Sequence, residues 1–107
     1  MATTPTSDQW TVTVDQTGRS GSIAYKEPLG SISFYWEFGG DDAVAIIWIE
    51  NSAIWSSRYP WAVDRRREIL ERVAREVVRQ KAPKCKAEID EQHGYMYIRE
   101  RPRGQTR

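Results

Sequence analysis

Residues 31–49 read SISFYWEF, then GGDD, then AVAIIWI, and this stretch decides the fold. Apolar residues alternate through the first run and fill most of the second, which is typical of two β-strands. Gly and Asp favour turn conformations, so residues 39–42 predict a tight turn with Phe38 opposite Ala43. The two strands then form a ribbon that is apolar on both faces.

One face of this hairpin is expected to be the core. In the predicted register Trp36 lies opposite the small residue Ala45, a pairing that packs a large ring without leaving a void. The face also carries other apolar side chains from both strands: Ile32, Phe34, Phe38, Ala43, Ile47 and Ile49.

The second face of the hairpin is about half apolar, whereas a half-solvated antiparallel sheet usually carries polar residues there. It collects Ser33, Tyr35, Glu37, Val44, Ile46 and Trp48. One helix cannot cover both faces of a sheet. Tyr35, Ile46 and Trp48 are therefore predicted to form a partner-binding surface.

The rest of the chain supplies more strands and one helix. Residues 10–14 and 22–27 alternate as strands, and a turn at residues 28–30 places Tyr25 opposite Ile32 and Ile23 opposite Phe34. The period changes to 3.6 from about Val63 to Lys81, which predicts an amphipathic helix with Asp64 as its N-cap and Pro83 beyond its end. An earlier start of this helix, at Pro60, is the alternative. Residues 86–91 and 95–99 predict a final hairpin. The sequence therefore predicts an α+β fold, an antiparallel β-sheet in the order β-β-β-β-α-β-β with one long amphipathic helix packed on one face.

Length and composition favour a single domain in a reducing compartment. The chain has 107 residues, of which 39% are hydrophobic, so we expect one α+β domain at residues 10–100 between disordered tails at 1–9 and 101–107. The single cysteine, Cys85, cannot form an intramolecular disulfide. The first residues resemble no signal peptide, and no apolar run is long enough to span a bilayer, so we expect a cytoplasmic protein without a membrane partner.

Charge is distributed unevenly along the chain. Residues 1–57 carry two basic and seven acidic side chains, whereas residues 58–86 carry ten basic and four acidic ones. Such a dipolar surface can steer a charged partner, or it can draw together copies of the same chain.

No sequence motif indicates a catalytic, metal or cofactor site. One histidine and one cysteine cannot supply the usual ligands of a zinc site, and GGDD lacks the spacing of a calcium loop. An enzyme would have to use Glu37 beside Tyr35, or His93 with Glu91 or Tyr95. The alternatives are a glutamate that keeps the sheet soluble and a solvated histidine in a turn. We therefore expect no enzymatic activity and no cofactor.

The segment at residues 51–61 is too aromatic for an ordinary solvated loop. Tryptophan, tyrosine and arginine dominate binding hot spots. The segment carries four of them: Trp55, Arg58, Tyr59 and Trp61. Two interpretations stay open, because these side chains could bind a partner or could cover the open end of the sandwich.

The helix offers a second kind of interaction. Arg65, Arg72, Arg75 and Arg79 are predicted to lie away from the apolar helix face. Together with the basic tail from Arg99 to Arg107 they could bind nucleic-acid phosphates. Acidic residues spaced four positions from arginines, such as Glu68 before Arg72 and Glu71 before Arg75, are instead typical of a solvated helix.

These observations favour a small non-enzymatic protein-interaction module, either a homodimer or a protein that binds another protein. A toxin-neutralising immunity protein or a small secretion chaperone fits the size and charge asymmetry, by analogy of architecture alone. Nucleic-acid binding and an enzyme built on Glu37, Tyr35 or His93 remain the alternatives.

Overall fold

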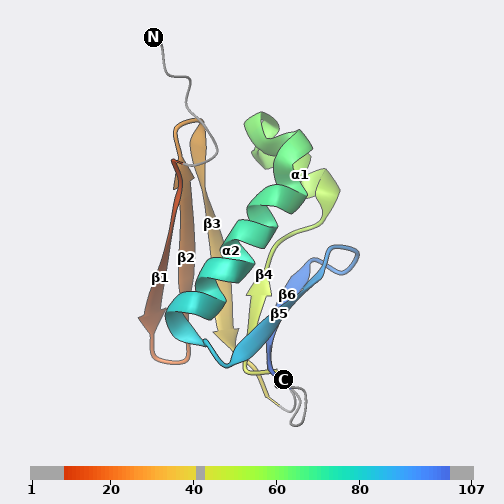
Figure 1. Cartoon of the computed structure of the whole chain (residues 1–107). Helices are drawn as coiled ribbons and strands as arrows, with labels where there is room; N and C mark the ends of the chain where they lie inside the picture. Colours follow the sequence, from red (N-terminus) through yellow and green to blue (C-terminus); the bar gives the residue numbers. More distant parts are fainter. Residues whose placement is uncertain (1–8, 41–42, 102–107) are drawn as a thin grey trace.

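The fold is a six-stranded antiparallel sheet with one long helix, which is the predicted α+β class (Figure 1). The computed structural model describes residues 9–40 and 43–101. Asp41 and Asp42 of the predicted turn, and nearly all of both predicted tails, lie outside the described residues. Among the described helices, none combines the length and the apolar character that crossing a membrane requires.

The strands follow the predicted meander and final hairpin. They are β1 (Thr11–Thr17), β2 (Ser20–Glu27), β3 (Gly30–Phe38), β4 (Ala45–Trp48), β5 (Cys85–Asp90) and β6 (Tyr95–Glu100). Their order in the sheet is β1-β2-β3-β4-β6-β5. The last strand, β6, therefore lies beside β4, and β1 and β5 form the two edges of the sheet.

Three helical segments connect β4 to β5. They are α1 (Ser52–Arg58), the 3-10 helix η1 (Pro60–Arg65) and α2 (Arg66–Lys81). The predicted end of the long helix is confirmed, because Ala82 is its C-cap and Pro83 follows. The predicted N-cap, Asp64, is wrong: Asp64 lies inside η1, and Arg65 occupies the N-cap of α2 without a side-chain cap. The chain enters α2 directly from the preceding 3-10 turns.

The register between β2 and β3 is confirmed, with Tyr25 opposite Ile32. The predicted register between β3 and β4 is wrong by two residues, because Phe38 lies opposite Ala45 and not Ala43, and Trp36 lies opposite Ile47 and not Ala45. The connection extends to Val44, whose N–H donates to the Ile98 carbonyl of β6 at 2.7 Å. A shift of two residues keeps the paired side chains of β3 and β4 on their predicted faces. Val44, which precedes β4, was expected on the second face, but it packs against the core cluster and lines a hollow on the α2 side of the sheet.

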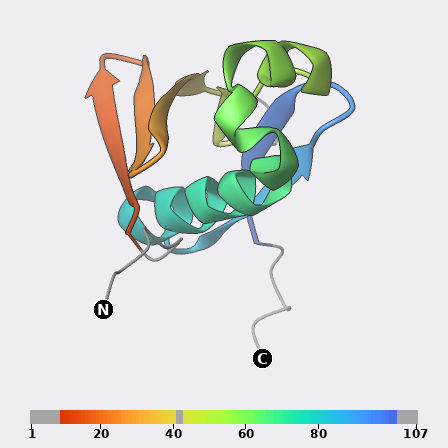
Figure 2. The same cartoon turned by 90° about the horizontal axis from the view of Figure 1, so that it is seen from above.

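The core lies between α2 and one face of the sheet, and α2 runs along one side of the curved sheet in Figure 2. Ile69, Leu70 and Val73 of α2 have no exposed surface. They pack in one cluster with side chains from the core face of the sheet: Ile23, Tyr25, Ile32, Phe34, Trp36, Ile47, Met96 and Ile98. Phe38, which was expected in the core, is 36% exposed at the end of β3.

Candidate interaction surface

Aromatic rings form a row across the sheet face opposite α2. Trp48 lies opposite Tyr35 of β3 on one side and opposite Tyr95 of β6 on the other. Its ring centroid is 5.2 Å from that of Tyr35 and 5.5 Å from that of Tyr95, and the Tyr95 centroid is 6.0 Å from that of Tyr97. Aromatic pairs at such separations attract each other beyond simple area burial.

We call this surface the aromatic face and define it as Tyr35, Ile46, Trp48, Tyr95 and Tyr97. Ile46 lies opposite Tyr97. Tyr35 is half exposed, at 50%, and the other four side chains are half-buried. Tyr35, Ile46 and Trp48 share this face as the sequence predicts. Tyr95 and Tyr97, which were not among the predicted site residues, complete it.

Charged side chains at the rim of the aromatic face pair with one another. Arg99 lies with its guanidinium carbon 4.7 Å from the Tyr97 ring centroid and donates to Glu88 at 2.8 Å. Lys86 lies 3.3 Å from the same carboxylate. The hydrogen bond from Arg99 lowers the pKa of Glu88 below its usual value. Glu88 therefore offsets part of the positive charge that Arg99 and Lys86 place on this side of the rim.

A hollow of about 360 Å³ adjoins the aromatic face where β3 and β4 separate. The pairing of these strands ends at Tyr35 and Trp48, so residues 30–34 of β3 have no strand on that side. The hollow brings together predicted site residues from three elements: Tyr35, Trp48, Arg58 and Tyr59. Arg58 also lies 3.7 Å from the carboxylate of Glu50, which lines the same hollow.

Glu50 has a backbone conformation that is rare for residues with a side chain. Its φ of 66° lies in the left-handed region. This conformation redirects the chain from β4 into α1, and the Glu50 carbonyl accepts a hydrogen bond from Arg66 at 2.5 Å. Strained residues of this kind persist where surrounding contacts hold them, and they concentrate at functional sites.

The aromatic segment after β4 divides into core and surface. Trp55 is only 1% exposed, and its indole N–H donates to the Ala62 carbonyl at 3.0 Å. Trp55 therefore covers the end of the core and is not accessible to a partner. Half-buried Trp61 packs closely over Gly30, where a Cβ atom would lie 2.5 Å from the Trp61 ring. Buried Trp55, half-buried Tyr59 and exposed Arg58 all line the hollow.

The predicted basic face of the helix is smaller than expected, because two of its arginines turn inward. Arg72 is buried and donates to the Tyr25 hydroxyl at 2.8 Å, so its predicted position away from the apolar face is wrong. Arg65 donates to both oxygens of Glu27, at 2.7 and 3.0 Å. Exposed Arg79 lies 2.7 Å from Glu76, and exposed Arg75 completes the set.

The inward-facing arginines surround one buried carboxylate. The Glu27 side chain is 4% exposed and accepts a third hydrogen bond, at 2.6 Å, from the Tyr25 hydroxyl. The hydrogen bonds from Arg65 lower the pKa of Glu27. Burial, followed by the hydrogen bond to Glu27, raises the pKa of Tyr25. This cluster joins β2 to α2. Its two arginines contribute less positive charge to the helix surface than predicted.

The two residues considered for catalysis, His93 and Glu37, lie in different environments. His93 is exposed in the turn before β6, and its Nδ1 lies 2.8 Å from Asp90, so its ion-pair partner is Asp90 and not Glu91 or Tyr95. Half-buried Glu37 lies between Ser20 of β2 and Ile46 of β4. Among residues 9–40 and 43–101, no group of three or more His, Cys, Asp or Glu side chains could hold a metal ion.

The aromatic face therefore combines rings, one aliphatic side chain and a charge-paired rim, which suits docking of another apolar protein surface. Its planar rings bury large areas at small cost in side-chain entropy. Compared with known protein families, curated proteins and solved structures, the chain matches none of them.

Proposed function

We propose that this protein is a small non-enzymatic interaction module that self-associates through the aromatic face. The observation that carries the proposal is the row of contacting rings, Tyr35, Trp48 and Tyr95, on the sheet face opposite α2. Large contiguous apolar patches on protein surfaces commonly mark interaction sites. Tryptophan and tyrosine at the centre of such a patch supply most of the binding energy in characterised interfaces.

A second copy of the chain is the occupant that best fits the charge of this surface. In a two-fold symmetric dimer each surface meets itself, so any net charge on it would be repelled by the same charge on the partner. Pairing of Glu88 with Arg99 and Lys86 reduces that repulsion. The formal net charge of the whole chain is only +1. Both features lower the electrostatic cost of self-association.

We place this function in the cytoplasm. Cys85, the single cysteine, is a buried free thiol on β5. Free buried thiols suit a reducing compartment, where they are kept from oxidation.

Replacement of Trp48 by lysine tests the proposal. Trp48→Lys places a charge at the centre of the proposed interface, and we expect the dimer to dissociate into folded monomers. Light scattering on a sizing column over a range of protein concentrations measures the mass. The control is Leu29→Lys, which introduces the same charge at a residue that is 59% exposed in the turn between β2 and β3. We expect this control to remain dimeric.

A parent protein that stays monomeric at high concentration would contradict self-association. The aromatic face would then be assigned to a different protein partner, and Trp48→Lys would serve as the negative control in its capture. Equal masses for parent and Trp48→Lys, both dimeric, would move the dimer interface to another surface.

A further inference from the structure

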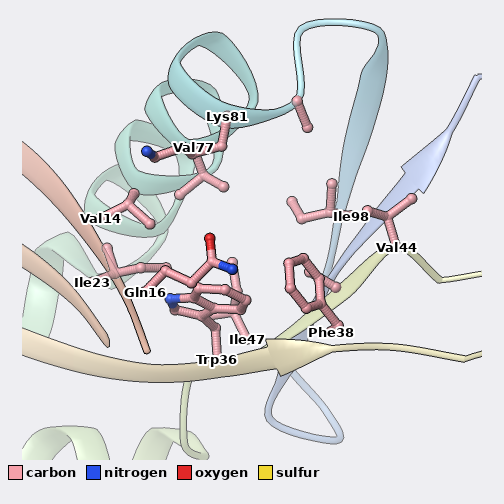
Figure 3. A pocket seen from close by; sticks show the side chains of 12 residues that line it. Val14, Gln16, Ile23, Trp36, Phe38, Val44, Ile47, Val77, Lys81 and Ile98 are labelled. Carbon is pink, nitrogen blue, oxygen red and sulfur yellow. The ribbon is translucent and has the colours of Figure 1, made fainter. Parts of the chain in front are cut away.

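A second hollow lies on the α2 side of the sheet, away from the aromatic face. It has a volume of about 150 Å³. In Figure 3 Val77 and Lys81 of α2 lie on one side of it, with Trp36, Ile47 and Phe38 of the sheet on the other. Its remaining walls are mostly apolar: Val14, Gln16, Ile23, Val44, Ala45, Ala82 and Ile98. Small residues at two of these positions, Ala45 and Ala82, help to leave the space open.

The size of this cavity is unusual for the interior of a small domain. Protein cores contain few voids larger than a water molecule. An apolar cavity of about 150 Å³ is large enough to accept a benzene-sized molecule. Phe38, one of its walls, is 36% exposed, so the cavity reaches the protein surface. A ligand could therefore enter without unfolding of the core.

The walls favour an aromatic ligand. Trp36 and Phe38 meet edge to face with their centroids 5.2 Å apart. The Trp36 indole N–H already donates to the Asp15 carbonyl at 3.0 Å, so the ring presents apolar surface to the cavity. An aromatic ring of a ligand packed against Trp36 and Phe38 would be stabilised by the same edge-to-face contacts.

The ammonium group of Lys81 indicates the charge that a ligand of this cavity would carry. Lys81 is the only charged residue among the twelve that line the cavity, and no ion pair joins its ammonium to any acidic group in the described part of the chain. The other polar lining residue, Gln16, donates its amide N–H to the Gly18 carbonyl. An unpaired ammonium at the edge of an apolar cavity is complementary to a carboxylate.

We infer that this cavity binds a small arylalkyl carboxylate, with the ring against Trp36, Phe38 and Val77 and the carboxylate at the Lys81 ammonium. The inference is independent of the proposed self-association, because the cavity and the aromatic face lie on opposite faces of the sheet. Binding needs no change in the fold.

The test uses the full chain and 3-phenylpropionate as the probe. Its affinity is measured by calorimetry, and its position is located from the NMR signals of the Val77, Ile47 and Ile98 methyl groups. The neutral control is 3-phenylpropan-1-ol. Lys81→Gln removes the charge, and Ala45→Leu fills the cavity from the sheet side. Should Ala45→Leu fail to fold, Ala82→Leu fills the space from the end of α2.

We expect the acid to bind more tightly than the alcohol and to shift all three sets of methyl signals. Lys81→Gln should weaken the acid about two- to fivefold, the contribution of an exposed ion pair, and leave the alcohol unchanged. A folded filling variant should bind neither. The inference is overturned if the acid and alcohol bind equally well to the parent, if filling the cavity leaves binding unchanged, or if the folded parent shows no methyl shifts at millimolar probe.

Discussion

Val73→Asp is expected to abolish the cooperative unfolding transition, leaving the chain unfolded at neutral pH and room temperature. Val73 has no exposed surface and lies in the middle of the cluster between α2 and the sheet. A buried carboxylate without a partner costs several kcal/mol, and the lost methyl packing adds about 1 to 2 kcal/mol. Together these approach the whole stability of a small domain, about 5 to 15 kcal/mol. Circular dichroism with thermal and denaturant unfolding measures the effect.

The matched control is Val63→Asp, the same substitution at a residue of η1 that is 43% exposed. We expect this variant to unfold within about 0.5 kcal/mol of the parent, as exposed substitutions usually do. A well-folded Val73→Asp protein would show that α2 does not pack on the sheet as described.

Glu27→Gln should give the second largest loss, about 3 kcal/mol in the free energy of unfolding. Removing one partner of a buried ion pair leaves the other charge uncompensated, at a cost of about 3 to 5 kcal/mol. We expect the low end of this range because the Arg65 side chain is still 24% exposed. Urea titration monitored by tryptophan fluorescence measures the change. Glu71→Gln, which removes an exposed partner of Arg67, is the control and should change stability by less than about 1 kcal/mol.

The pH dependence of this loss follows from the lowered pKa of Glu27 in the folded state. A carboxylate whose pKa falls on folding stabilises the protein above its unfolded pKa, about 4.3. This stabilisation disappears as the pH falls through the lower folded value, because Glu27 then becomes neutral like glutamine. The difference in the free energy of unfolding between the parent and Glu27→Gln should therefore be full at pH 7. It should disappear on acidification below about pH 4.3. A difference that is independent of pH would mean that the charge of Glu27 is not its cause.

Local sequence patterns predicted which face of the sheet the paired side chains of β3 and β4 occupy, but not how these two strands align. The alternation around Phe34 and Trp36 placed the core face correctly even though the register with β4 was wrong by two residues. Burial fixes which face a side chain occupies, but the length of a connection depends on hydrogen bonds such as that from Val44 to Ile98. These bonds come from β6, which lies far away in the sequence.

The same dependence on distant residues explains what was missed in the candidate site. Tyr95 and Tyr97 alternate along their strand, but only the insertion of β6 beside β4 brings them to Trp48 and Ile46. A helical wheel likewise could not indicate that Arg72 turns inward, because its partners Tyr25 and Glu27 come from β2. The helix α1 had a local signal, since Asn51 caps it by accepting a hydrogen bond from the Ile54 N–H.

The central claim is that the aromatic face becomes buried on self-association. NMR spectra of the parent protein, recorded over a concentration series, test it most directly through the indole N–H signals. Trp48 lies on the aromatic face, whereas Trp55 is buried with its N–H bonded to Ala62 and serves as an internal reference. We predict that the Trp48 signal shifts or broadens with increasing concentration while the Trp55 signal stays fixed. A Trp48 signal that does not change, while light scattering reports a dimer, would contradict the claim and place the interface elsewhere.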